Sequence, residues 1–303
     1  MFSTILLATT GTASCDDAAK IAFDLAQKYN ARLLVLHVLG MPARGYSPYV
    51  KDYRTGQEVS CEPDYIDWVK EELKNTYTKQ LGAATNKVEI ETVVGVPATE
   101  ILRVARRESA DLIVMGAHAR DEEAASSRFR DVVGSTMRKV AKSSRAPVLI
   151  LGRPCVTCFW YFSNIVFATD FSKAAHSAFL FAHKVSKEIG CRLHLFHCVE
   201  LPGVGVYDQK EIENKVAEAQ EKMEHLYVKN MAGFDNYDIT VREGTPHVEI
   251  LKFSREKSCD LIVMAHHTKE VPPEEAEIGG TVEQVVLRSA CPVASVNRPD
   301  RLE

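Results

Sequence analysis

The sequence lacks any long apolar run, any excess of positive charge and any basic leader. Its longest apolar stretches, residues 5–8 and 155–162, fall far short of the roughly 18 residues that a membrane-spanning helix needs. Lys and Arg number 37 against 41 Asp and Glu, so no global positive field would hold a nucleic-acid backbone. The first residues run directly into a strand pattern rather than a signal peptide. We therefore expect a cytoplasmic protein with no membrane or nucleic-acid partner.

Cysteine pairs with a recognised spacing are also scarce. The eight cysteines are spread along 303 residues. We therefore expect most of them to be reduced thiols, often buried, as in cytosolic proteins. Only Cys155 and Cys158 form a Cys-x-x-Cys, and no second such pair completes the four ligands of a structural zinc site. We interpret the pair as incidental thiols, with redox sensing or a shared metal as the alternatives.

What the sequence does contain is an internal repeat. Residues 95–102, Gly-Val-Pro-Ala-Thr-Glu-Ile-Leu, return as residues 244–251, Gly-Thr-Pro-His-Val-Glu-Ile-Leu, and residues 109–115 return as 258–264. Such a repeat indicates a duplicated unit, and 303 residues suit two domains of roughly 150 residues each. We predict a first domain over residues 1–152, a linker over 153–163 and a second domain over 164–303.

Within each half, short apolar runs alternate with helical periodicity. Residues 5–8 and 33–36 have the continuous apolar character of parallel strands buried on both faces. Between them apolar residues recur at helical spacing, and Ser14 and Asp17 have the spacing of a capping box. Further strands are expected at residues 87–94, 112–115 and 148–151. Further helices are expected at residues 65–81, after Pro97 and after Gly134. Five strands alternating with four helices predict an α/β fold, a doubly wound open parallel five-stranded sheet made twice.

In such sheets a ligand binds at the carboxyl ends of the strands, so the loops after strands one and four are the candidate site. After strand one the halves carry Thr9-Thr10-Gly11-Thr12 and Thr169-Asp170-Phe171-Ser172. After strand four they carry Met115-Gly116-Ala-His-Ala119 and Met264-Ala265-His-His-Thr268, and the last helix opens at Gly134-Ser135-Thr136 and Gly280-Thr281-Val282.

Together with the Gly-x-Pro entry to the third helix, these motifs resemble the universal stress protein family in its tandem form. The resemblance implies an adenine nucleotide alpha hydrolase-like fold that binds ATP or AMP in these loops. Glycines let backbone N–H groups approach phosphate oxygens, and a Gly-Ser helix start adds a hydroxyl donor. Carried over, the nucleotide-binding positions are Thr10, Val38, Met115, Gly116, Ala119, Gly134, Ser135 and Thr136 in the first half, and Asp170, Gly280 and Thr281 as the weaker set in the second.

Neither half carries the whole family pattern. Ala119 replaces the second glycine of the first half, and Ala265 and Thr268 replace both glycines of the second. An alanine costs about 1 kcal/mol or more where the backbone must be left-handed. The leading prediction is a stress-response protein with an adenine nucleotide in its first half. A scaffold that binds no nucleotide and a weak ATPase are the alternatives.

No catalytic residues and no metal site are predicted. Adenylating enzymes of related fold use His-x-Gly-His or Ser-Gly-Gly-x-Asp-Ser near strand one, and neither half matches. His194 and His197 are three apart on a strand and so point to opposite faces, which argues against a shared metal. His266 and His267 are interpreted as solvated loop residues, with a metal or anion contact as the alternative.

Two further expectations concern the surface of the halves. Residues 40–63 are long and irregular, and we interpret them as a variable connection, with a lid over the first-half site as the alternative. The family resemblance also implies that the last strands of the two halves pair, giving an intramolecular pseudo-dimer that buries sheet edges. A homodimer of such chains is the alternative to a single pseudo-dimeric chain.

Overall fold

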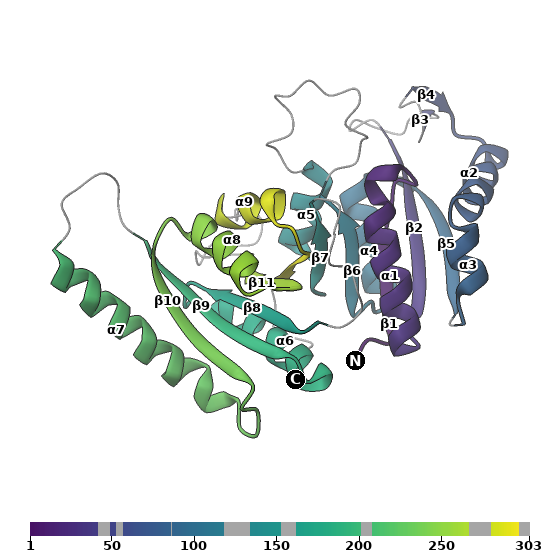
Figure 1. The fold of residues 1–303 in the computed structure, drawn as a ribbon. Coiled ribbons are helices and arrows are strands. Elements are labelled where there is room, and N and C mark those ends of the chain that lie inside the picture. The colour runs from purple at the N-terminus through teal and green to yellow at the C-terminus, as the bar shows by residue number, and fades with distance from the viewer. Residues whose placement is uncertain are drawn as a thin grey trace. The chain divides into compact units, whose positions relative to one another are not determined.

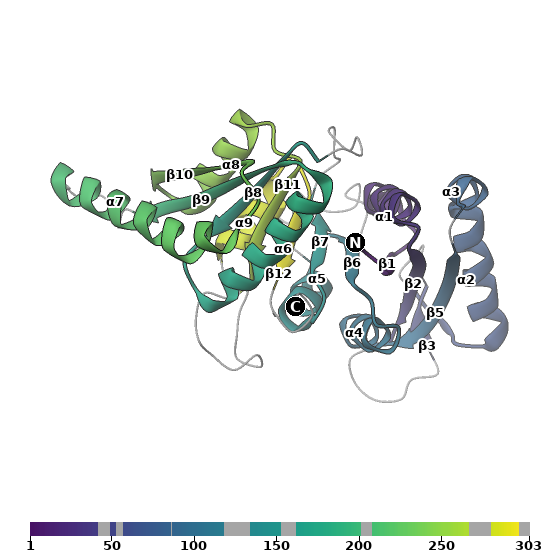
Figure 2. The ribbon, with the colours of Figure 1, turned by 90° about the horizontal axis from the view of Figure 1, so that it is seen from below.

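The computed structural model of the chain divides into two compact units, Met1–Leu151 and Gly152–Glu303. The described residues are 1–41, 49–52, 57–85, 87–117, 134–152, 162–200, 208–266 and 280–296. The predicted linker and the predicted pairing of the halves stay predictions. In each unit a parallel sheet lies between helices on both of its faces, as Figures 1 and 2 show.

The sheet of the first unit has the strand order β7-β6-β1-β2-β5. Its strands are β1 (Thr4–Ala8), β2 (Arg32–Gly40), β5 (Val88–Gly95), β6 (Leu112–Gly116) and β7 (Val148–Leu151). Its helices are α1 (Asp16–Tyr29), α2 (Pro63–Thr76), α3 (Thr78–Ala83), α4 (Pro97–Arg107) and α5 (Ser135–Ser143), with a 3-10 turn at Ala13–Cys15.

The second unit repeats this plan with the order β12-β11-β8-β9-β10. Its strands are β8 (Asn164–Thr169), β9 (Arg192–Glu200), β10 (Tyr237–Gly244), β11 (Leu261–Ala265) and β12 (Val293–Val296). Its helices are α6 (Lys173–Ile189), α7 (Gln209–Leu226), α8 (Pro246–Glu256) and α9 (Gly280–Arg288). Neighbouring strands within both sheets run parallel. The predicted fold class, two doubly wound α/β sheets, is confirmed.

The core of each unit follows from the apolar strand runs. Ile5, Leu6 and Leu7 of β1 are fully buried because helices cover both faces of the sheet. Burying each such side chain contributes about 1.5–3 kcal/mol. The helix α1 adds its predicted apolar stripe to this core and ends at Asn30, whose left-handed φ of 49° stops the helix.

The duplication is visible in the backbone as well as in the sequence. Residues with positive φ recur at equivalent places in the two units: Gly11 (71°) and Phe171 (64°), Asn30 (49°) and Gly190 (79°), Ser109 (51°) and Ser258 (49°). Such conformations are uncommon for residues other than glycine, because the side chain then crowds the backbone. The two units therefore share turn geometry even where their residues differ.

Two local predictions need correction. The capping box of Ser14 and Asp17 does not form, because residues 13–15 make a 3-10 turn and α1 begins at Asp16 without a side-chain cap. The Ser14 hydroxyl instead lies 2.9 Å from that of Thr12. The expectation of an irregular stretch at 40–63 also needs correction in its described part, where Tyr49–Lys51 (β3) and Glu58–Ser60 (β4) pair as antiparallel strands. A role of this stretch as a lid stays a prediction.

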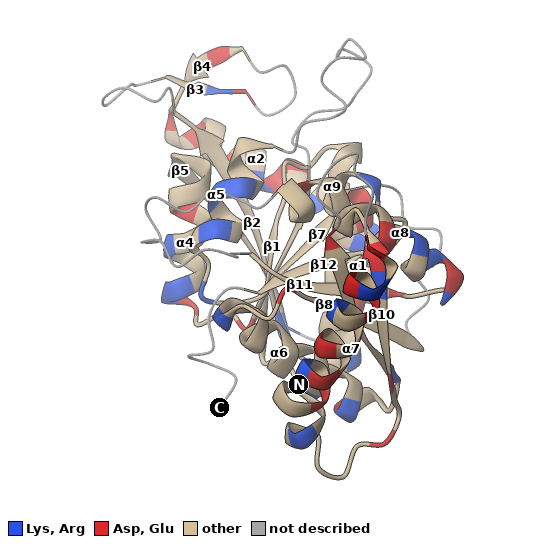
Figure 3. Ribbon diagram, turned by 90° about the vertical axis from the view of Figure 1, so that its left-hand side faces the viewer, with Lys and Arg blue, Asp and Glu red and all other residues tan. Residues whose placement is uncertain are grey.

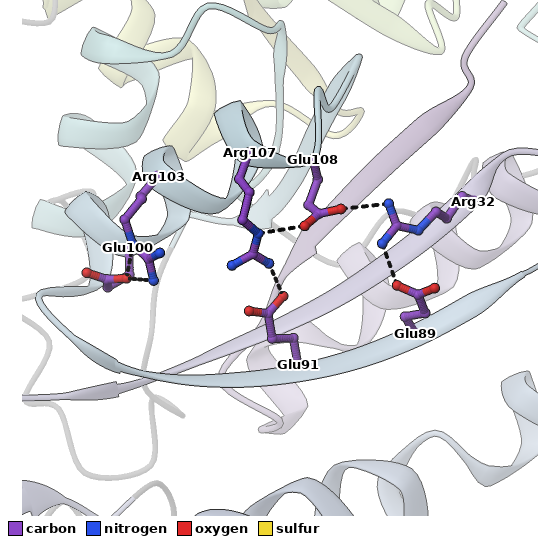
Figure 4. Close-up of polar contacts among 7 residues, drawn as sticks. All are labelled: Arg32, Glu89, Glu91, Glu100, Arg103, Arg107 and Glu108. Atoms are coloured by element: carbon purple, nitrogen blue, oxygen red, sulfur yellow. Dashed lines mark hydrogen bonds and ion pairs between the residues drawn. The ribbon is translucent and has the colours of Figure 1, made fainter.

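Charged residues are found mainly on the helices, while the strands of the sheets are largely uncharged (Figure 3). One network joins β2, β5 and α4 of the first unit (Figure 4). In it Arg32 donates to Glu89 and, at 2.7 Å, to Glu108, and Arg107 donates to Glu91 and, at 2.6 Å, to Glu108. The Arg32 guanidinium, followed by Lys87, lowers the pKa of Glu89 to about 2. The network ties the start of β2 to the end of α4.

Candidate functional site

A cavity of about 560 Å³ lies in the second unit at the carboxyl ends of its parallel strands. Its wall combines the ends of β8, β9 and β11 with α7 and the first turns of α8 and α9. Both the size and the position are those of small-ligand pockets in doubly wound sheets. All three predicted residues of the second half, Asp170, Gly280 and Thr281, line this cavity.

The loop after β8 is held in place by its own polar groups. The Thr169 hydroxyl lies 2.6 Å from that of Tyr227 and accepts the N–H of Phe171 at 2.9 Å. Asp170 accepts the N–H of Ser172 at 3.0 Å, and the Ser172 hydroxyl caps α6 by accepting the N–H of Ala175. These bonds are typical of Asx turns and helix N-caps. They fix the Asp170 carboxylate at the cavity wall.

His197 is a cavity residue to which the sequence gave no role in binding. Its Nδ1 lies 2.8 Å from the Thr169 carbonyl oxygen, which can only accept, so Nδ1 carries the proton. Burial lowers the pKa of His197, which therefore is neutral at pH 7 and has an acceptor at Nε2. In the first unit His37 makes the same bond to Thr9 at 2.9 Å. The recurrence of His at equivalent strand positions was the signal that could have identified it.

The cavity wall carries charges of both signs. Asp170, Glu200 and Glu218 contribute carboxylates, and Lys215 and Lys222 contribute ammonium groups. The Lys215 ammonium already lies 2.5 Å from the carboxylate of Glu211, one turn earlier on α7. The Lys222 ammonium lies 5.9 Å from the centre of the Phe171 ring. Among the described residues that line this cavity, carboxylates therefore outnumber ammonium groups.

Burial also affects the thiol of Cys198, the counterpart of Val38. Burial, with smaller contributions from Glu249 and Glu200, raises its pKa to about 12. The thiol therefore stays protonated at neutral pH and is a poor nucleophile. Its contribution to the cavity is apolar surface and a backbone at the end of β9.

The residues of the last helices of the two units are equivalent in a different register from the one that the sequence comparison indicates. The helix α5 spans residues 135–143 and α9 spans residues 280–288, and each is followed by its strand at the same distance. Gly280 therefore corresponds to Ser135 rather than to Gly134, and Thr281 corresponds to Thr136. The expected equivalence of Gly134 and Gly280 was wrong by one residue, because short Gly-rich motifs match in either register.

In the first unit the predicted residues lie at the same edge of the sheet. Thr10 follows β1, Val38 is near the end of β2, and Met115 and Gly116 close β6. The Gly134 N–H donates to the Ala117 carbonyl at 2.9 Å, which brings the start of α5 to the end of β6. Ser135 and Thr136 then open the helix. The Thr10 hydroxyl lies 2.8 Å from that of Thr12 and 3.2 Å from the Cys15 sulfur.

Several predictions fall outside the described residues. These are the ones on Ala119, on Cys155 and Cys158, and on His267 and Thr268. His266 is described and is fully buried beside Ser295, so its interpretation as a solvated loop residue was wrong. The end of β11 packs it into the core of the unit.

The remaining polar cluster is at the opposite ends of the strands. His194 is 2% exposed, and its ring nitrogens lie 2.7 Å from Asp238 and 3.1 Å from Asn164. Within the described ranges, no three His, Cys, Asp or Glu side chains converge closely enough to hold a metal ion. Along the same part of the chain, no helix combines the length and apolar character that crossing a membrane requires.

A doubly wound parallel sheet with a cavity at its carboxyl edge is the architecture of α/β proteins that bind small ligands. Comparison with known proteins gives the family of this chain. The model of the universal stress protein family matches residues 1–152 and again 162–297. The chain belongs to this family and contains its domain twice.

Single-domain relatives match about half of the chain. A universal stress protein of Thermus aquaticus is 37% identical over 155 residues, 50% of this chain and 99% of the relative. One from Methanocaldococcus jannaschii is 27% identical over 163 residues, 51% of this chain and 84% of the relative. A universal stress protein of Archaeoglobus fulgidus has a crystal structure with a TM-score of 0.66 and 23% identity, covering 98% of this chain and 97% of that one. That likeness shows the fold across both units.

Proposed function

We propose that this tandem universal stress protein is a stress-response protein that binds an adenine nucleotide, and that the cavity of the second unit is one place where it does so. The observation that carries the proposal is the convergence of Asp170, Gly280 and Thr281 on one cavity of about 560 Å³. These are the second-half positions that the family pattern implies. They come from the start and the end of the unit, and the parallel sheet brings them together.

The chemistry of the wall fits an adenine nucleoside. Ile250 and Met264 offer apolar surface to the faces of a purine. The Asp170 carboxylate can accept from an amino group or a ribose hydroxyl, and the neutral His197 ring supplies a further acceptor. Convergent polar groups in an otherwise apolar pocket are what fixes the orientation of a small ligand.

The first unit is proposed as a second nucleotide site, through Thr10, Val38, Met115, Gly116 and the start of α5. Gly134, Ser135 and Thr136 offer backbone N–H groups and hydroxyls where a phosphate group would lie. The first turn of α5 contains no acidic residue, so no carboxylate of that turn offsets the positive end of the helix dipole.

Binding rather than catalysis is the proposed activity. In the described wall of the second-unit cavity, burial raises the pKa of the Cys198 thiol to about 12. A thiol that stays protonated is not an activated nucleophile. A cytoplasmic location fits this reading and stays a prediction.

Titration calorimetry of the full chain with AMP tests the proposal. Asp170→Ala should weaken the binding of AMP at least about tenfold if the carboxylate bonds the ligand, since hydrogen bonds to charged groups contribute about 1.5–3 kcal/mol. Thr10→Ala, at the equivalent place in the first unit, reports on the other site. Asp235→Ala, an exposed residue that does not line the cavity, is the matched control. No heat of binding with AMP or ATP would reject nucleotide binding and favour a scaffold.

A further inference from the structure

The two units differ where a phosphate chain would lie. Because α5 and α9 align from their first residues, Ser135 corresponds to Gly280 and Arg138 corresponds to Glu283. The second unit has thus lost a hydroxyl donor and has an acid in the first turn of its helix in place of a base. Acidic side chains in a first turn already interact favourably with the helix dipole, which leaves less of it for a phosphate.

The end of the fourth strand of the sheet differs in the same direction. Ala265 lines the cavity at the position that Gly116 holds in the first unit. A glycine there would let phosphate oxygens approach the backbone, and a methyl group keeps them away. Of the described residues at this strand end, Met264 and Ala265 line the cavity, and both are uncharged.

The rest of the wall adds like charge. Asp170, Glu200 and Glu218 face a cavity to which Lys215 and Lys222 also contribute. Lys215 is already paired with Glu211 at 2.5 Å. A phosphate monoester brings about 1.5 to 2 negative charges at pH 7, and a triphosphate brings more. Each added phosphate therefore meets repulsion from three described carboxylates, while one of the two described lysines is already paired.

From these differences we infer that the second-unit cavity selects the adenine nucleoside and discriminates against the phosphate chain, so that affinity falls from adenosine to AMP to ATP. This inference rests on the proposed function of that cavity. It assigns the two units different preferred ligands: the nucleoside in the second, where AMP binds more weakly, and a nucleotide whose phosphates reach α5 in the first.

The test is calorimetry of the full chain with adenosine, AMP and ATP at low salt without added Mg²⁺. Each ligand is also titrated into Asp170→Ala, and the binding that this variant loses is assigned to the second-unit cavity. Adenosine should bind roughly fivefold to tenfold more tightly than ATP, and added salt should narrow that ratio, because like charges near a protein surface repel by about 1 kcal/mol or more and are screened.

Two variants test the cause. The double variant Gly280→Ser and Glu283→Arg, which restores the residues of α5, should raise ATP affinity relative to adenosine. A Cβ at Gly280 meets no atom within 4 Å, so the serine fits. Glu218→Gln should move the ratio in the same direction. Glu221→Gln, on the same helix but not lining the cavity, should leave it unchanged.

Two outcomes would count against the inference, and they can be told apart. Binding of ATP as tight as that of adenosine, or tighter, overturns the selectivity and leaves the proposed function standing. If neither adenosine, AMP nor ATP shows binding that depends on Asp170, the proposed function of this cavity fails and the inference fails with it.

Discussion

The hydroxyl groups of Thr169 and Tyr227 lie 2.6 Å apart, and those of Thr9 and Tyr77 lie 2.6 Å apart at the equivalent place in the first unit. Both tyrosines are at most 2% exposed. In each unit the bond joins the end of the first strand to the residue that ends a helix beyond the second strand, Tyr77 after α2 and Tyr227 after α7. The threonine oxygen also accepts a loop N–H. It therefore fixes the loop that begins each candidate site.

Removing this bond should destabilise the second unit. We expect Tyr227→Phe to lower the free energy of unfolding by about 1 kcal/mol, and Thr169→Val by about 1–3 kcal/mol, because it strands the buried Tyr227 hydroxyl and also removes the acceptor of the Phe171 N–H. Urea denaturation followed by circular dichroism measures both. Tyr237→Phe, a half-buried tyrosine of β10, should change the free energy by less than about 0.5 kcal/mol. Equal effects of Tyr227→Phe and Tyr237→Phe would show that the bond does not stabilise the fold.

Stability should fall below about pH 6.5. Burial lowers the pKa values of His37, His194 and His197 in the folded chain. As the pH falls below about 6.5, these side chains therefore bind protons more readily in the unfolded chain than in the folded chain. The stability that this contributes is fully present above the unfolded pKa and is lost as the pH falls through it, on the order of 1 kcal/mol per pH unit for each buried imidazole. Urea denaturation at pH 7.5, 6.5 and 5.5 measures it.

A single histidine can be isolated in that series. Asp24, whose burial raises its pKa to about 6, works in the opposite direction, so variants must be compared with the parent chain at each pH. His37→Asn keeps a donor near the Thr9 carbonyl and should flatten the pH dependence. His225→Asn, at an exposed position, should not. A pH profile of His37→Asn identical to that of the parent would contradict the assignment.

Two equivalent glycines should tolerate alanine unequally. Both glycines have a positive φ, 157° at Gly95 and 135° at Gly244, so their space distinguishes them: a Cβ at Gly95 would lie 2.7 Å from Glu100 Cγ, and a Cβ at Gly244 would lie 3.2 Å from Glu249 Cγ. We expect Gly95→Ala to destabilise by about 1–3 kcal/mol and Gly244→Ala by less. Gly82→Ala, in α3 with open space around it, should be neutral or stabilising by up to about 1 kcal/mol. Thermal denaturation ranks the three, and a reversed order would refute the steric argument.

The ion pairs of Arg32 should matter more than an isolated pair. Arg32 bonds Glu89 and Glu108 from two elements, while Arg103 bonds, among the described residues, its helical neighbour Glu100 (Figure 4). Arg32→Met should cost about 1–2 kcal/mol at low salt, and Arg103→Met about 0.5 kcal/mol or less, because exposed pairs within one helix are weak. Raising the salt concentration should shrink the first value. Equal losses for both variants would remove the network as a source of stability.

The fold could be predicted from the sequence because its signals are local. The buried run Leu112–Gly116, the helix entry at Pro97 and the repeated Asp-Leu-Ile-Val-Met each indicate an element without knowledge of its neighbours. The antiparallel pair of β3 and β4 was not predicted, because its strands are three residues long and mostly exposed. Strands that short have no periodicity to read.

The site could be predicted only in part, since it depends on how elements meet. Asp170 and Gly280 were expected at the carboxyl edge, but Glu218 and Lys222 reach the cavity from α7, whose charged sequence reads as a solvated surface. The sequence-based prediction placed the nucleotide in the first half because that half keeps more of the glycines that bind phosphate. The second unit has a cavity without those glycines, because the ends of strands and the starts of helices form its wall.

The most direct test of nucleotide binding in the second unit is a crystal structure of the full chain grown with saturating AMP. We predict density for the purine and ribose beside Asp170, Cys198 and Met264, with the adenine faces against Ile250 and Met264. A second unit whose cavity contains only solvent at saturating AMP, whether or not the first unit is occupied, would contradict the account.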